Sequence, residues 1–65
     1  MPKKIRELIA DLERAGFRKR GGKGSHRNYT HPFYSGKVTL SGQEGDDAGR
    51  YQEKLVRIAL KEAQE

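Results

Sequence analysis

The stretch GGKGSHRNYTHP, from Gly21 to Pro32, holds the residues of this 65-residue chain that are best suited to chemistry on a phosphate. His26 stands near its centre, and a histidine with an unperturbed pKa of about 6.5 can take or give a proton near neutrality. Glycines on its N-terminal side let the backbone approach a ligand and turn N–H groups toward a phosphate. The candidate phosphate-binding residues around His26 are Arg20, Lys23, Gly24, Ser25 and Arg27.

RNA cleavage without a metal needs a base for the 2′-hydroxyl, an acid for the leaving oxygen and positive charge on the phosphate. His26 fits one of the proton-transfer roles, with Lys23 or Arg27 holding the phosphate. The sequence names no second proton-transfer group with comparable force. The alternative is that His26 is an ordinary polar residue of a strand, because most strand histidines are not catalytic.

Charge points to a polyanionic partner. Fourteen Lys and Arg residues oppose nine Asp and Glu residues, which gives a formal net charge of +5. The segment from Arg14 to Lys37 contains seven basic residues and no acidic one. Such a segment favours nucleic acid first and an anionic membrane second. A solvated basic face that keeps the protein soluble is the remaining alternative.

The chain has no cysteine, which excludes disulfides and thiolate metal sites and fits a cytoplasmic protein. We expect no metal and no cofactor, because His26 and His31 fall on opposite faces of a strand and no third ligand is evident. Charged residues interrupt the N-terminal segment, which predicts neither a signal peptide nor a membrane span.

The elements that must position His26 follow from hydrophobic periodicity. Ile5, Leu8, Ile9 and Leu12 predict an amphipathic helix from Pro2 to Ala15, ended by Gly16. Phe17–Arg20 reads as a first strand and Ser25–His31 as a second, in which Tyr29 faces the core and His26 faces outward. Phe33–Gly36 is expected to form a turn before a third strand, Lys37–Leu40.

A second helix is predicted after the polar loop Ser41–Asp47, with Asp46 or Asp47 as its N-cap. Tyr51, Leu55, Ile58 and Ala59 repeat at helical spacing and are expected to face the core, with Val56 and Leu60 widening the stripe. The order α-β-β-β-α predicts an α+β fold in one domain, residues 1–65. Both helices would cover one face of a three-stranded antiparallel sheet, as in the double-stranded-RNA-binding domain (dsRBD).

The ordered combination of an amphipathic helix, Gly16-Phe17, a short basic stretch, Gly24-Ser25-His26, Tyr29 and His31-Pro32 resembles the HicA (YcfA-like) mRNA interferase toxins of toxin–antitoxin systems. The resemblance covers nearly the whole chain. It implies a dsRBD-like fold, endoribonuclease activity and inhibition by a HicB-like antitoxin. It also places the catalytic histidine on His26 and the glycine before it on Gly24.

Three functions compete at this point. The first is an endoribonuclease toxin that acts on mRNA. The second is a non-catalytic RNA-binding module that uses the same basic surface, and the third is a small protein-interaction domain. The triplet Gly24-Ser25-His26 favours the first over the second, because phosphate binding alone needs no titrating group there.

Overall fold

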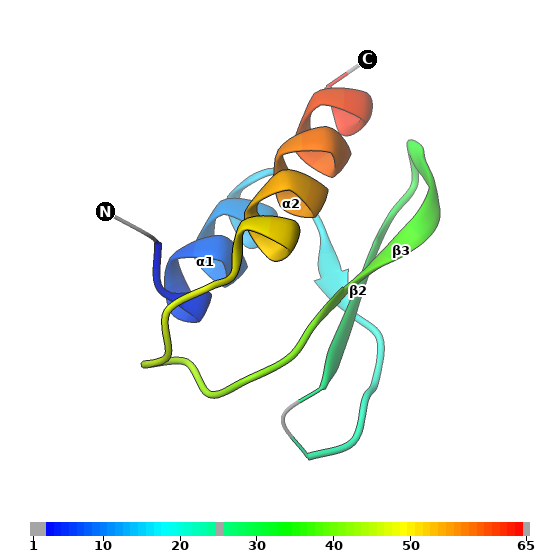
Figure 1. The fold of residues 1–65 in the computed structure, drawn as a ribbon. Helices are drawn as coiled ribbons and strands as arrows, with labels where there is room; N and C mark the ends of the chain where they lie inside the picture. The colour runs from blue at the N-terminus through cyan, green and yellow to red at the C-terminus, as the bar shows by residue number, and fades with distance from the viewer. Residues whose placement is uncertain (1–2, 25, 65) are drawn as a thin grey trace.

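The chain folds into two helices packed on one face of a three-stranded sheet, whose other face is open (Figure 1). A computed structural model describes residues 3–24 and 26–64. In chain order the elements are α1 (Ile5–Arg14), β1 (Arg18–Lys19), β2 (Arg27–His31), β3 (Tyr34–Leu40) and α2 (Arg50–Ala63). The sheet is antiparallel in the order β1-β2-β3. The predicted α+β, dsRBD-like layout is confirmed.

Helix α1 begins at Ile5, later than predicted, because the loop after β3 supplies its cap. The backbone N–H groups of Ile5 and Arg6 donate to the carbonyls of Asp46 and Glu44, at 2.9 and 3.1 Å. These bonds satisfy two N–H groups that have no partner within the helix. Pro2, expected in the first turn, lies outside the described residues.

Gly16 ends α1 as the sequence predicts. Its φ of +99° lies in the left-handed region that favours glycine. The N–H of Phe17 donates to the carbonyl of Leu12 at 2.9 Å, and the N–H of Gly16 donates to that of Glu13 at 3.0 Å. This pair of bonds is the Schellman motif, and it turns the chain directly from α1 into β1.

The predicted register of the central strand is confirmed around Tyr29. Tyr29 pairs with Val38, and both side chains are buried against the helices. Alternation along β2 therefore directs Asn28 and Thr30 to the open face. Arg18 pairs with Thr30 and shares that face.

The hairpin between β2 and β3 differs from the prediction. The turn consists of Pro32 and Phe33, and β3 begins at Tyr34, so a turn over Phe33–Gly36 is wrong. His31 pairs with Tyr34, and the register shifts between Tyr29 and His31. Because of this irregularity, β3 includes Ser35 and Gly36 and starts earlier than its apolar pattern suggests.

Helix α2 buries a face rotated from the predicted one. Val56, Ala59 and Ala63 are buried, whereas Tyr51 is 75% exposed and Ile58 is 42% exposed. The expectation that Tyr51 and Ile58 belong to the core is therefore wrong. Small alanines line the buried face, which allows α2 to pack closely on the sheet and α1.

The acidic residues before α2 do not cap it. Gly49 is the N-cap, while Asp46 accepts a hydrogen bond from the Gln43 N–H at 3.0 Å. The carboxylate of Asp47 lies 2.7 Å from the Lys4 ammonium. Asp46 thus forms a hydrogen bond within the loop, and Asp47 forms an ion pair with the residue before α1. The predicted capping role of these acids is therefore wrong.

The core is a single cluster that both helices and the sheet share. Most of the predicted core residues are in it, Ile9 and Leu55 are half-buried against it, and Ile58 is outside it. The buried residues are Ile5, Leu8, Leu12, Phe17, Tyr29, Val38, Leu40, Ala48, Val56, Ala59 and Ala63.

Candidate nucleic-acid interface

The candidate site lies in the loop that joins β1 to β2. Two backbone bonds extend the pairing of these strands into the loop: Arg20 N–H to Asn28 C=O at 2.7 Å, and Asn28 N–H to Gly21 C=O at 3.1 Å. At the far end, the N–H of His26 donates to the carbonyl of Lys23 at 2.9 Å and closes a tight turn. The loop that carries the predicted site residues is therefore braced by backbone bonds at both ends.

Gly22 is packed against the backbone of His26. A Cβ at this position would overlap the His26 carbonyl oxygen and lie 3.1 Å from the Cα of Arg27. Its φ of +132° is also one that L side chains rarely adopt. Only glycine allows the two sides of the loop to approach this closely.

Gly24 differs from Gly22 in its surroundings. A Cβ on Gly24 would meet no atom of the described residues within 4 Å, although its φ of +57° is left-handed. Gly24 thus provides a turn conformation, whereas Gly22 provides space. Gly22 is absent from the site residues that the sequence predicts, and the signal for it was the doubled glycine at 21 and 22.

His26 lies immediately before β2, which begins at Arg27 and not at Ser25 as predicted. The histidine is exposed, as are Lys23 and Gly24. Its side chain is therefore accessible to solvent, as expected for a residue that contacts a ligand. Ser25 lies outside the described residues.

Arg27 points away from the open face of the sheet. It pairs with the buried Leu40, and its Nη1 donates to the carbonyl of Gly42 at 2.9 Å. The half-buried guanidinium thus connects the His26 loop to the loop after β3. Its charge lies at this junction, whereas the side chain of Arg20 lies along the sheet.

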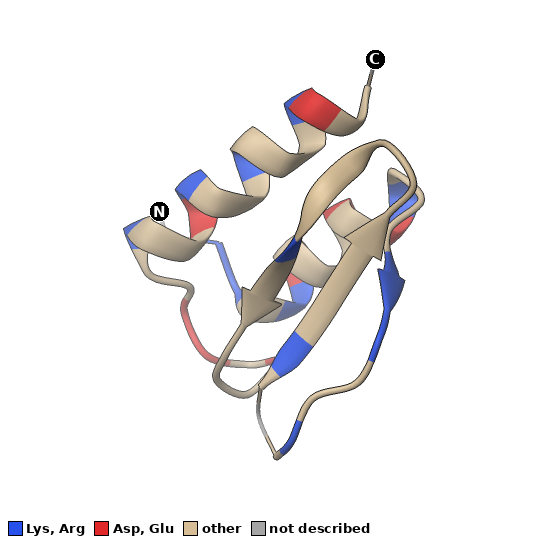
Figure 2. Ribbon diagram, turned by 90° about the vertical axis from the view of Figure 1, so that its right-hand side faces the viewer, with Lys and Arg blue, Asp and Glu red and all other residues tan. Residues whose placement is uncertain are grey.

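The open face of the sheet carries polar and basic residues. Thr39 donates from Oγ1 to Oδ1 of Asn28 at 2.8 Å, across the two longer strands. The cations of this face are Arg18, Arg20 and Lys37, placed by strand alternation. None of the three strands contains an acidic residue, and Figure 2 shows the acids on the helices and on the loop after β3.

Residues 5–64 match the family described as the HicA toxin of bacterial toxin–antitoxin systems. The chain belongs to the HicA toxin family. No curated protein and no solved structure gives a significant match. The match spans nearly the whole HicA-family chain, including the His26 loop and both helices, so the predicted resemblance is confirmed.

The second histidine of this HicA-family chain, His31, holds the end of the sheet together. Its Nδ1 accepts from the N–H of Phe33 at 3.0 Å, so the proton of the neutral ring is on Nε2. Nε2 lies 3.0 Å from the carbonyl of Ala15 and donates to it. The ring also packs on Phe17, with centroids 4.9 Å apart. The half-buried His31 therefore has a structural role at this end of the sheet.

Within residues 3–24 and 26–64, no group of three His, Cys, Asp or Glu side chains is arranged to bind a metal ion. Neither of the helices described there is long and apolar enough to cross a bilayer.

Proposed function

We propose that this chain is an endoribonuclease toxin, an mRNA interferase that a HicB-like antitoxin neutralises. The observation that carries the proposal is the exposed His26, next to an acid-free basic sheet face, in a chain of the HicA toxin family. The enzyme would act as a single domain in the cytoplasm, where mRNA is found. It would need no cofactor.

In the proposed reaction, the 2′-hydroxyl oxygen of the RNA attacks the adjacent phosphorus. A bond forms between phosphorus and the 2′-oxygen, and the bond to the 5′-oxygen of the next nucleotide breaks. His26 transfers one of the two protons involved, either from the 2′-hydroxyl or to the leaving oxygen. A second group or water transfers the other.

The remaining loop residues would bind the phosphate. Lys23 and Arg20 are exposed cations on the two sides of the Gly21-Gly22 pair, where they can offset the charge that develops on the phosphate oxygens. Backbone N–H groups around Gly24, and the hydroxyl of Ser25, are further donors. Arg27 contributes positive charge and holds the loop through its bond to Gly42.

The antitoxin is proposed to bind across the open sheet face and to cover His26. Acidic side chains on the partner would complement Arg18, Arg20 and Lys37. RNA and antitoxin would then compete for the same surface. A complex in which His26 remained accessible to RNA would exclude this mode of inhibition.

A non-catalytic RNA-binding module is the second candidate, because the basic face would bind RNA without His26. The two functions differ in their products. The catalytic proposal predicts fragments with 2′,3′-cyclic or 3′-phosphate ends and 5′-hydroxyl ends, and cleavage that persists in excess chelator. RNA with a 2′-deoxy nucleotide at the cut site should resist cleavage. Cleavage of this 2′-deoxy RNA at the normal rate would rule out attack by the 2′-hydroxyl.

A further inference from the structure

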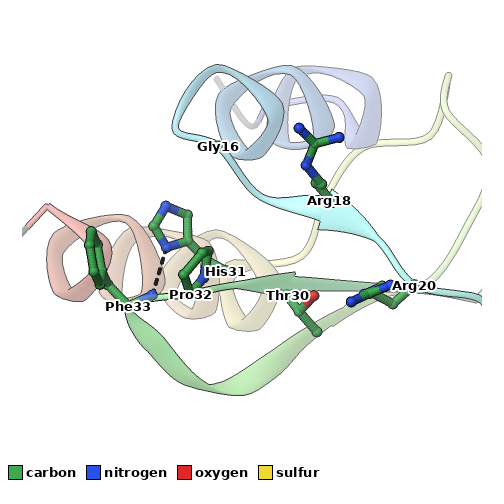
Figure 3. A pocket seen from close by; sticks show the side chains of 7 residues that line it. All are labelled: Gly16, Arg18, Arg20, Thr30, His31, Pro32 and Phe33. Carbon is green, nitrogen blue, oxygen red and sulfur yellow. Dashed lines mark hydrogen bonds between the residues drawn. The ribbon is translucent and has the colours of Figure 1, made fainter.

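A groove of about 620 Å³ lies at the end of the sheet, between the α1–β1 turn and the tip of the β2–β3 hairpin (Figure 3). It is lined by Gly16, Arg18, Arg20, Thr30, His31, Pro32 and Phe33. Arg20 belongs to the groove and also begins the His26 loop. The groove is therefore connected to the proposed catalytic loop along the edge strand β1.

The groove is positively charged. Arg18 and Arg20 line it from β1 and its extension, and Thr30 offers a hydroxyl from β2. None of the described lining residues is acidic, and within the described chain neither guanidinium pairs with a carboxylate. Glu13 lines a neighbouring hollow, which shares Gly16, Arg18 and Arg20 with the groove and also contains Lys19. This arrangement suits a phosphate group.

Phe33 adds an exposed aromatic ring to the same groove. Its side chain is 67% exposed at the tip of the hairpin, so the ring is not part of the core. Its backbone is fixed by the 3.0 Å bond to His31 Nδ1, and the two rings lie 5.6 Å apart. His31 is fixed in turn by its bond to the carbonyl of Ala15. The backbone of Phe33 is thus fixed at the groove, and its ring lies beside the anchored ring of His31.

We propose that this groove binds a nucleotide of single-stranded RNA, with the base stacked on Phe33 and the phosphate held by Arg18 and Arg20. Single-stranded nucleic acids are bound in this way, by aromatic side chains that stack on bases and cations that follow the backbone. The inference rests on the proposed RNA substrate and adds a binding subsite to it.

Arg20 lies at the end of the groove next to the His26 loop, whereas Phe33 lies at the hairpin tip, away from that loop. Six residues of extended chain from His26 to Pro32 span about 20 Å, at about 3.3 Å per residue. The base stacked on Phe33 would therefore belong to a nucleotide other than the two joined by the cleaved bond.

The test measures binding of a fluorescently labelled, single-stranded RNA oligonucleotide to protein carrying His26→Ala, so that the RNA stays intact. Adding Phe33→Ala should weaken binding on the order of tenfold, because one stacked base is lost. Phe33→Tyr should restore it. The matched control is Tyr51→Ala, which removes a 75% exposed aromatic ring from α2 and should leave the affinity unchanged.

A second pair of variants tests the cations. Arg18→Gln should weaken RNA binding and reduce the slope of log affinity against log salt by about 0.7, the value for one phosphate of a single strand. Arg50→Gln removes an exposed arginine from α2 and should change neither quantity. This pair remains informative if Phe33→Ala lowers the melting temperature.

Unchanged RNA affinity in both Phe33→Ala and Arg18→Gln would overturn the subsite. So would equal losses in Phe33→Ala and Tyr51→Ala, or a loss of affinity for a HicB-like antitoxin alone, which would make the groove a protein contact. RNA cleavage is measured separately with His26 intact. Loss of binding in Phe33→Ala, combined with no cleavage by the native chain, would support the subsite and contradict the proposed catalysis.

Discussion

The absent side chain of Gly22 makes room for the backbone carbonyl of His26. A Cβ on Gly22 would overlap this oxygen and would lie 2.9 Å from the carbonyl carbon. The position of the proposed catalytic residue therefore depends on a glycine four residues before it. The two residues approach each other because the loop turns back at Lys23, whose carbonyl accepts from the His26 N–H.

Gly22→Ala should displace His26 and reduce RNA cleavage at least tenfold. Backbone strain at a position with φ of +132° should also cost about 1–3 kcal/mol of folding free energy. Gly45→Ala is the control, since a Cβ there would meet no described atom within 4 Å. Cleavage rates and urea unfolding of both variants check this. Full activity in Gly22→Ala would show that His26 does not need this loop conformation.

Lys23→Ala and Arg27→Ala should have different effects. Lys23 is exposed, so its loss should weaken RNA binding and reduce the salt slope by about 0.7 without changing the melting temperature. Arg27→Ala should weaken binding and also lower stability by about 1.5–3 kcal/mol, because the charged hydrogen bond to Gly42 is lost. The control is Lys54→Ala, an exposed change on α2. Identical stability of native and Arg27→Ala proteins would mean that the Gly42 contact contributes nothing.

Leu12→Ala should destabilise the fold by about 2–5 kcal/mol, because this side chain of α1 is fully buried in the shared core. Ile58→Ala, on the exposed face of α2, should change stability by less than about 0.5 kcal/mol. Chemical denaturation of both variants measures the difference. A loss of stability in Ile58→Ala as large as that in Leu12→Ala would contradict the packing face assigned to α2.

Stability should fall at alkaline pH because of Tyr29. Burial raises the pKa of its hydroxyl above the usual value of 10.0, and nearby Glu13 adds to this. Above about pH 10 the unfolded chain loses this proton before the folded chain does, so the free energy of unfolding decreases as pH rises. Tyr29→Phe should flatten the decrease, whereas Tyr51→Phe, on an exposed ring, should not. Unfolding curves between neutral and strongly alkaline pH decide this, and an unaltered alkaline slope in Tyr29→Phe would contradict it.

The sequence predicts the layout well because its signals are local. The stripe from Ile5 to Leu12 and the cap at Gly16 define α1, and the alternation around Tyr29 defines the face of β2. These patterns require no knowledge of distant contacts. The outward position of His26 was predicted from the same alternation, although the strand itself starts at Arg27, two residues later than predicted.

The features that the sequence does not predict are set by tertiary contacts. The middle of α2 is apolar on several sides, so only packing against α1 and the sheet selects Val56 and Ala59 over Ile58. The hairpin turn at Pro32 depends on pairing between His31 and Tyr34. The spatial role of Gly22 and the inward direction of Arg27 also depend on neighbours that composition does not reveal.

The most direct test of the account compares single-turnover RNA cleavage by the native chain and by His26→Ala. The exposed histidine contributes little to the core, so the variant should fold and bind RNA with unchanged affinity. Its cleavage rate should fall by roughly 10²–10⁴-fold, the contribution typical of a general acid or base. A His26→Ala protein that cuts RNA as fast as the native chain would contradict the catalytic role and leave RNA binding as the function of this surface.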